Sequence, residues 1–292
     1  MAYLDYTHKF SSGIEVGVNG EIFEQSFGNR DITEDLLDLT HIAYQKVRKI
    51  IGIDGTGASG NSKIFDIKEF DKEYSLLEKG LDSVIITNLK ETQEKISLIL
   101  GVADCGAIAI SDKSGNTIGL AHAGYAGVAK DIIGNTIENL CKINSNLEEF
   151  SFYVAPMIGK KFEFEEGKYF EIFEDLAKKY KLNLREYFNP ILLPLSKIEK
   201  DSTPKGYLDL RKIIIRIFEL NGICEKQIIF SEVETNNPNN SWPSYRLYTI
   251  YNSMKQKIEK GEKLTILEQE LLDSENSDFF AKDKRIGVFV EN

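Results

Sequence analysis

A cysteine and a histidine stand at the ends of neighbouring predicted strands. The apolar run 96–102 is broken just before Cys105, a second run follows at 107–110, and a third run at 117–122 ends on His122. Strand ends that lead into loops are where rigid scaffolds hold functional side chains, and small residues beside both positions leave room above a sheet. The pattern therefore indicates a site built from a thiol and an imidazole.

The residues alone leave three interpretations of Cys105 and His122 open. Zn²⁺ binds Cys sulfur and His nitrogen readily, so the pair is a candidate metal site. A histidine that holds a cysteine as its thiolate would instead provide a nucleophile and its base. In the third interpretation both side chains are simply buried, because cysteines outside disulfides are among the most buried residues.

The segment that follows His122 favours a functional site. Residues 123–127, AGYAG, join the third predicted strand to a predicted helix. Their glycines allow the backbone to approach a ligand, and the helix N-terminus offers N–H groups to an anion, so Gly124 and Tyr125 are candidate anion-binding residues. Asp104, next to the cysteine, is a candidate acceptor behind a ligating or catalytic histidine.

The remaining patterns predict the elements that position this site. Strands are predicted at 96–102, 107–110, 117–122, 151–158, 227–233 and 285–290, and helices at 31–51, about 128–142, about 168–180 and 209–222. Because these elements mix without strict alternation, we expect an α+β fold of mixed α/β layers, with mixed β-sheets flanked by helices. Cys141 falls on the apolar stripe of its helix and is predicted to be a core residue, whereas the glycine-rich stretch 54–62 is typical of a flexible loop.

Size and charge limit the partners. The chain has 292 residues and a formal net charge of -10, which makes nucleic acid and anionic membrane surfaces poor partners. It has no signal-peptide pattern and no apolar run long enough to span a bilayer, so we expect a cytoplasmic protein with three reduced cysteines. We expect one domain over 1–254, followed over 255–292 by a charged, helix-prone extension with a closing strand.

Six segments together resemble the YfiH-like family of multicopper polyphenol oxidase/laccase-domain proteins, in the family's order and over nearly the whole chain. They are HKFSS (8–12), ADCGAIAI (103–110), GLAHAGYAGVAKDII (119–133), YVAPMIGKKFEFEEG (153–167), YLDLRKIIIRIFELNGI (207–223) and SYR (244–246). The resemblance implies a YfiH-like fold and a Zn²⁺ site. It also implies purine nucleoside activities, namely phosphorolysis, deamination of adenosine and cleavage of methylthioadenosine.

The resemblance places the metal on Asp54, Cys105 and His122. The cysteine and histidine match the family motifs, but Asp54, in GIDGT (52–56), stands where the family has a histidine. Asp is a competent Zn²⁺ ligand, so such a site with an open fourth position is chemically reasonable. The chain has 3 His in total, too few for a multicopper oxidase, which needs roughly ten His ligands.

Two arginines expected from the family are replaced by Gly13 and Ala126, which leaves Arg246 as a candidate anion binder. Our first hypothesis is a zinc-dependent enzyme that acts on adenosine, inosine or methylthioadenosine, a small nucleoside, with phosphate as a candidate co-substrate. The second is a non-catalytic binding or regulatory member of the family. The third is a Cys-His thiol hydrolase or deamidase that is insensitive to chelators. The preferred base, the choice of phosphate or water as acceptor, and the oligomeric state stay open.

Overall fold

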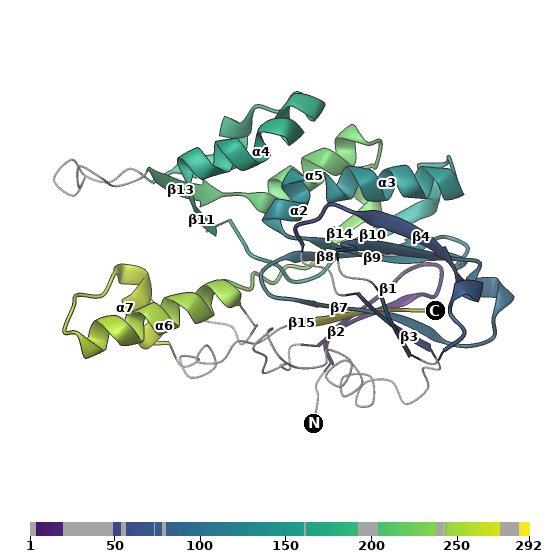
Figure 1. Ribbon diagram of the computed structural model, residues 1–292, viewed down its shortest axis with the longest axis horizontal. Helices are drawn as coiled ribbons and strands as arrows, with labels where there is room; N and C mark the ends of the chain where they lie inside the picture. Colours follow the sequence, from purple (N-terminus) through teal and green to yellow (C-terminus); the bar gives the residue numbers. More distant parts are fainter. Residues whose placement is uncertain are drawn as a thin grey trace.

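A computed structural model describes residues 4–19, 49–53, 57–72, 74–77, 80–160, 162–191, 204–237, 242, 244–274 and 286–292. These residues form two six-stranded sheets and a smaller three-stranded sheet. The large sheets are stacked, and helices cover the outer face of one of them (Figure 1). The α+β fold with mixed layers that the sequence predicts is confirmed.

The first sheet is completed by the last strand of the chain. Its order is β1 (Leu4–Lys9), β2 (Glu15–Asn19), β15 (Ile286–Glu291), β7 (Ile96–Val102), β3 (Lys49–Ile53) and β5 (Tyr74–Leu76). Strand β15 lies antiparallel between β2 and β7, which confirms the predicted closing strand. Residue 254, where the sequence analysis divides the chain, lies inside helix α6 (Tyr245–Glu259).

The central strands of the second sheet are buried on both faces. Its order is β14 (Ile228–Phe230), β10 (Phe150–Val154), β8 (Gly106–Asp112), β9 (Ile118–Ala123), β6 (Ser83–Thr87) and β4 (Ser62–Asp66). Along β8, Ala107 and Ala109 belong to the core between the two sheets, whereas Ile108 and Ile110 belong to the core beneath the helices. Burial on both faces explains why these strands read as continuous apolar runs.

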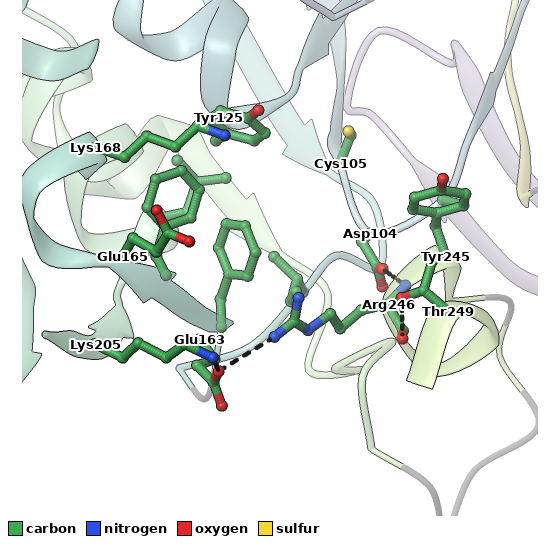
Figure 2. A pocket seen from close by; sticks show the side chains of 15 residues that line it. Asp104, Cys105, Tyr125, Glu163, Glu165, Lys168, Lys205, Tyr245, Arg246 and Thr249 are labelled. Carbon is green, nitrogen blue, oxygen red and sulfur yellow. Dashed lines mark hydrogen bonds and ion pairs between the residues drawn. The ribbon is translucent and has the colours of Figure 1, made fainter. Parts of the chain in front are cut away.

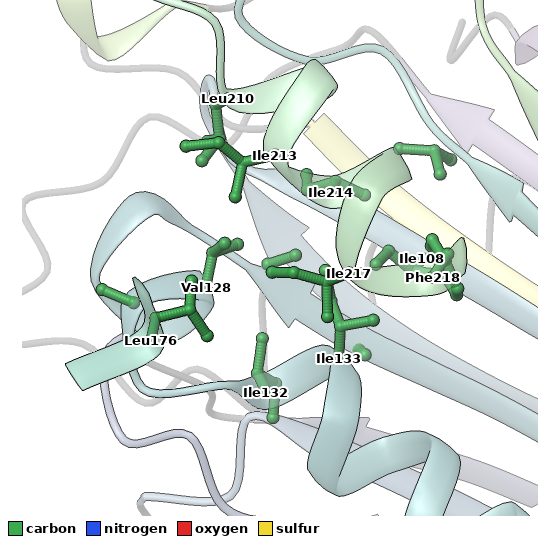
Figure 3. Close-up of a cluster of buried hydrophobic side chains, with 14 of the residues drawn as sticks. Ile108, Val128, Ile132, Ile133, Leu176, Leu210, Ile213, Ile214, Ile217 and Phe218 are labelled. Carbon is green, nitrogen blue, oxygen red and sulfur yellow. The ribbon is translucent and has the colours of Figure 1, made fainter. Parts of the chain in front are cut away.

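Helices and the small sheet form the outer layer. The helices are α2 (Tyr125–Ala129), α3 (Ile132–Ile143), α4 (Glu166–Tyr180) and α5 (Leu210–Leu220), with the small sheet β11 (Phe162–Glu165), β13 (Lys205–Leu208) and β12 (Phe188–Pro190) beside them. Short 3-10 helices are η1 (Ile67–Glu69), η2 (Leu89–Glu91), η3 (Leu147–Glu149), η4 (Leu184–Tyr187) and η6 (Glu225–Gln227). Ile213, Ile214 and Ile217 of α5 pack toward α2, α3 and α4, which precede α5 in the chain, and toward the sheet beneath (Figure 3). The predicted helix 209–222 is confirmed, with Asp209 as its N-cap.

Two helix predictions are wrong in detail. The helix predicted over about 128–142 is interrupted, because Asp131 adopts a left-handed backbone with φ 63° and caps α3; α2 ends at Ala129 and α3 begins at Ile132. Cys141 is exposed rather than part of the core. It follows the buried Leu140, and one residue turns a helix by about 100°, away from the packed face.

The helix predicted over 31–51 lies for the most part outside the described residues. Its last three residues, 49–51, belong to strand β3 instead. The strand predicted over 227–233 is shorter, since β14 ends at Phe230. Among the residues that can be placed, no helix has the length and apolar character needed to cross a membrane.

Candidate functional site

A pocket of 430 Å³ opens where the turn between β7 and β8 meets the start of α6, the start of α2 and the small sheet (Figure 2). Its aromatic lining residues are Tyr125, Phe162, Phe164 and Tyr245, and its charged ones are Asp104, Glu163, Glu165, Lys168, Lys205 and Arg246. Cys105 also lines it. The pocket therefore brings together three residues that the sequence predicts for one site: Cys105, Tyr125 and Arg246.

Cys105 and His122 lie diagonally across two paired strands. In the register of β8 and β9, Gly106 faces Ala123 and Ala107 faces His122. Cys105 is thus one step further along, opposite Gly124, and a Cβ on Gly124 would lie 3.0 Å from its sulfur. Diagonal neighbours of this kind are about 7–8 Å apart at Cα, within reach of a shared ligand.

His122 is buried beneath the backbone of Gly57 and is not part of the pocket lining. The residue is 6% exposed, and a Cβ on Gly57 would lie 2.7 Å from the Nε2 atom of His122. Gly57 also has φ +66°, so both the close approach and the backbone conformation require glycine here. The imidazole and the loop that carries Gly57 therefore form one packed unit.

The buried carboxylate of Asp82 holds this loop in place. It accepts hydrogen bonds from the backbone N–H groups of Gly57 at 2.8 Å, Ser59 at 2.5 Å and Gly60 at 3.0 Å, and from the Ser59 hydroxyl at 2.8 Å. The carbonyl of Asp82 accepts the N–H of His122 at 2.6 Å. Residues 57–60 are thus anchored, which differs from the flexible loop that the composition of 54–62 predicts.

The start of α2 is only partly available to an anion. Gly124 is its N-cap, and the N–H of Gly127 donates to the carbonyl of Gly57 at 2.6 Å. A Cβ on Gly127 would lie 2.7 Å from that same oxygen. The glycines of the AGYAG segment therefore admit the Gly57 loop in addition to shaping the space beside Cys105.

Asp104 does not serve the histidine as the sequence analysis expected. Its carboxylate accepts hydrogen bonds from the hydroxyls of Thr235 at 2.6 Å and Ser244 at 3.0 Å, and from the N–H of Arg246 at 2.7 Å. Burial raises the pKa of Asp104, and these three hydrogen bonds oppose that rise. The carboxylate is therefore committed to Thr235 and to the start of α6.

Two cations converge on one carboxylate oxygen at the pocket. Oε1 of Glu163 lies 2.9 Å from Nζ of Lys205 and 3.8 Å from Nη2 of Arg246 (Figure 2). Among the described residues Lys168, which lines the same pocket, is in no ion pair. Arg246 is consequently both a salt-bridge residue and a residue of the pocket lining.

The described residues hold no group of three or more potential metal ligands. Cys105 and His122 supply two donors that suit Zn²⁺, and a third would have to come from elsewhere. Asp54, the third ligand expected from the resemblance, lies outside the described residues.

Several pocket residues escaped the sequence analysis, namely Lys168, Lys205, Glu163 and the aromatic pair Phe162 and Phe164. The alternating FEFE stretch at 162–165 is a local strand signal that could have identified β11. Nothing in the sequence indicates that this strand faces α6, because that proximity is set by tertiary packing.

The fold and pocket define an α+β protein with stacked mixed sheets and a Cys-His corner at one end of the central strands. Residues 62–256 match the family described as multi-copper polyphenol oxidoreductase laccase, and the chain belongs to this family. The resemblance drawn from the sequence motifs is thereby confirmed.

Solved structures show the same fold at low sequence identity. The hypothetical protein YfiH of Bacillus licheniformis has a TM-score of 0.58 at 15% identity, covering 95% of this chain and 92% of that one. YlmD of Geobacillus stearothermophilus has a TM-score of 0.55 at 16% identity, covering 95% and 91%. Protein NMB0706 of Neisseria meningitidis has a TM-score of 0.56 at 11% identity, covering 97% of both chains.

One relative carries an enzyme name. A purine nucleoside phosphorylase of Synechocystis sp. is 28% identical over 137 residues, which are 43% of this chain and 49% of that protein. The aligned part therefore spans about half the length of that relative.

Proposed function

We propose that this protein is a purine nucleoside enzyme of the phosphorylase type, acting on adenosine, inosine or methylthioadenosine. The observation that carries the proposal is the pocket, which joins aromatic faces, cations and Cys105 in 430 Å³. A purine offers a flat apolar ring that aromatic side chains bind well, and cations bind phosphate. The phosphorylase name of the Synechocystis relative supports the same class.

The aromatic residues suit the nucleobase. The ring of Tyr125 lies 5.1 Å from that of Phe164, and the ring of Phe162 lies 5.3 Å from that of Phe164, all at steep angles to one another. Such edge-to-face clusters present both ring faces and ring edges to a ligand. We place the base against this cluster and the sugar toward Cys105.

The cations suit an oxyanion. Lys205 and Arg246 approach one carboxylate oxygen of Glu163, so their charged groups are close enough to share a phosphate. In phosphorolysis a phosphate oxygen forms a bond to C1′ of the ribose while the C1′–N bond breaks. The bonding electron pair leaves with the base, which takes up a proton. Deamination would use water at the base instead and release ammonia.

Zinc is part of the proposal. Cys105 and His122 would bind it together with Asp54, and the ion would act as a Lewis acid at the reacting centre. The fit rests on the diagonal placement of the two described donors across β8 and β9.

The test is chromatography of the products from adenosine, inosine and methylthioadenosine. Zinc-loaded protein is incubated with each nucleoside, with and without phosphate, and Cys105→Ala is the matched control. We expect free base or deaminated product that disappears in the variant and after treatment with a chelator, and that returns when zinc is added. No product above the variant's background would refute the proposal for these substrates and favour the non-catalytic alternative.

A further inference from the structure

Asp104 has an unusual backbone at the pocket. Its φ is +70°, and the other described non-glycine residues with positive φ are Asn88, Asp131 and Lys181. Of these four residues, Asp104 alone lines the pocket. The left-handed conformation is costly for a residue with a side chain, and it persists where surrounding contacts fix it.

The contacts of Asp104 connect segments that are distant in sequence. Its carbonyl accepts the N–H of Ile158 at 2.9 Å, and its carboxylate accepts the donors of Thr235, Ser244 and Arg246. Thr235 and Arg246 follow it by 131 and 142 residues. One residue thus joins the cysteine-bearing turn to three other segments, two of which, those of Ile158 and Arg246, line the pocket.

The helix that Asp104 holds has a core of its own. Leu247, Tyr251 and Met254 of α6 pack with Leu271 of α7 (Ile266–Leu272), apart from the two main hydrophobic clusters. The two helices extend to one side of the stacked sheets (Figure 1). The N-terminal part of α6 provides the pocket wall formed by Tyr245, Arg246 and Thr249. The position of that wall therefore depends on how α6 is fastened at its start.

We propose that Asp104 is a positioning residue that fixes this α6 wall relative to Cys105. The wall carries Arg246, so the contribution of Arg246 to anion binding depends on the Asp104 carboxylate. The substrate part of this proposal rests on the proposed function, whereas the structural part does not.

The chain offers a reporter and a matched control. Trp242 is its single tryptophan, lies two residues before Ser244 and packs against the core between the sheets. Asp131 is also a left-handed aspartate, with φ 63°, whose carboxylate accepts from Gly134, Lys179 and Tyr180. Asp131 does not line the pocket. Asp131→Gly therefore removes a carboxylate from a left-handed backbone, as Asp104→Gly does, but at a position away from the pocket.

The first experiment compares these two glycine variants in the absence of substrate. Glycine tolerates positive φ, so each substitution removes the carboxylate while permitting the backbone. We expect Asp104→Gly to shift the fluorescence emission of Trp242 to longer wavelength and to increase the quenching of this emission by acrylamide. We also expect faster alkylation of Cys105, measured by peptide-resolved mass spectrometry. Asp131→Gly should lower the melting temperature and change none of the three. Unchanged Trp242 and Cys105 signals in folded Asp104→Gly would overturn the proposal.

If Asp104→Gly fails to fold, Thr235→Val and Ser244→Ala each remove one donor and keep the carboxylate. Each should produce a smaller change of the same sign in Trp242 quenching, and wild-type quenching in both would count against the proposal. Asp104→Asn, which keeps one acceptor oxygen, should lie between wild type and Asp104→Gly.

The second experiment measures the coupling between Asp104 and Arg246. In the wild type, Arg246→Ala should raise KM for phosphate by about tenfold, the size expected for one charge-assisted hydrogen bond. In Asp104→Gly the same substitution should change KM little, because the arginine is already displaced. Equal effects in both backgrounds would contradict the coupling. If no nucleoside is turned over at all, the proposed function fails, and the Trp242 and Cys105 measurements still decide the role of Asp104.

Discussion

Gly57→Ala tests whether His122 belongs to the site, and Gly60→Ala is its matched control. Both glycines lie in the loop held by Asp82, with φ +66° and +73°. A Cβ would lie 2.7 Å from Nε2 of His122 in the first case and 2.7 Å from the carbonyl oxygen of Lys130 in the second. The two substitutions therefore share the backbone strain and the tight contact, and they differ in what is displaced.

The expected loss of stability is similar for both variants. Alanine in the left-handed conformation costs about 1–2 kcal/mol, and overpacking adds about 1–3 kcal/mol. We expect each variant to lower the free energy of unfolding by about 2–5 kcal/mol in urea denaturation. Only Gly57→Ala pushes the imidazole, and it also strains the hydrogen bond from the N–H of Gly127.

The deciding assay is the amount of zinc retained, together with nucleoside turnover, for both folded variants. Gly57→Ala should lose zinc and turnover, whereas Gly60→Ala should keep both despite a comparable loss of stability. If the two variants retain the same zinc and activity, the imidazole beneath Gly57 is a packing residue, and the reasoning about His122 is refuted.

Two further predictions concern carboxylates. Glu163→Gln should tighten the binding of inorganic phosphate, measured by calorimetry, because the carboxylate no longer competes for Lys205 and Arg246. Exposed ion pairs are worth about 0.2–1 kcal/mol, so we expect a change of about two- to fivefold. Unchanged affinity would argue against a phosphate site at these two cations. Burial raises the pKa of Glu291 from 4.5 to about 7. The contribution of the Glu291 side chain to stability is therefore lost as pH rises from about 4.5 to 7. Glu291→Gln should stabilise the protein by about 3 kcal/mol at pH 8 and hardly at all at pH 4. Urea denaturation at both pH values checks this, and a change in stability of equal size at pH 4 and pH 8 would contradict it.

The sequence predicts those parts of the site that lie on regular elements. Cys105 and His122 stand at the meeting ends of the apolar runs that form the paired strands β8 and β9, and the bounds of these runs locate both residues. Tyr125 follows a strand-to-helix junction, and Arg246 belongs to a short motif at the start of α6. For these residues the local pattern and the tertiary position agree.

The rest depends on contacts that no local pattern encodes. Lys205 reaches the pocket from the small sheet, and Asp104 binds partners more than 130 residues later in the chain. Cys141 illustrates the opposite error, since an apolar residue beside a buried stripe lies at the stripe's edge and becomes exposed. Burial at such edges is decided by the neighbouring helices rather than by periodicity.

The most direct test of the central claim is the product formed from inosine by zinc-loaded protein in phosphate. Our account predicts hypoxanthine and ribose 1-phosphate in equal amounts, both dependent on phosphate and both absent with Cys105→Ala. Inosine that remains intact, or a product that forms equally well with Cys105→Ala, would contradict it.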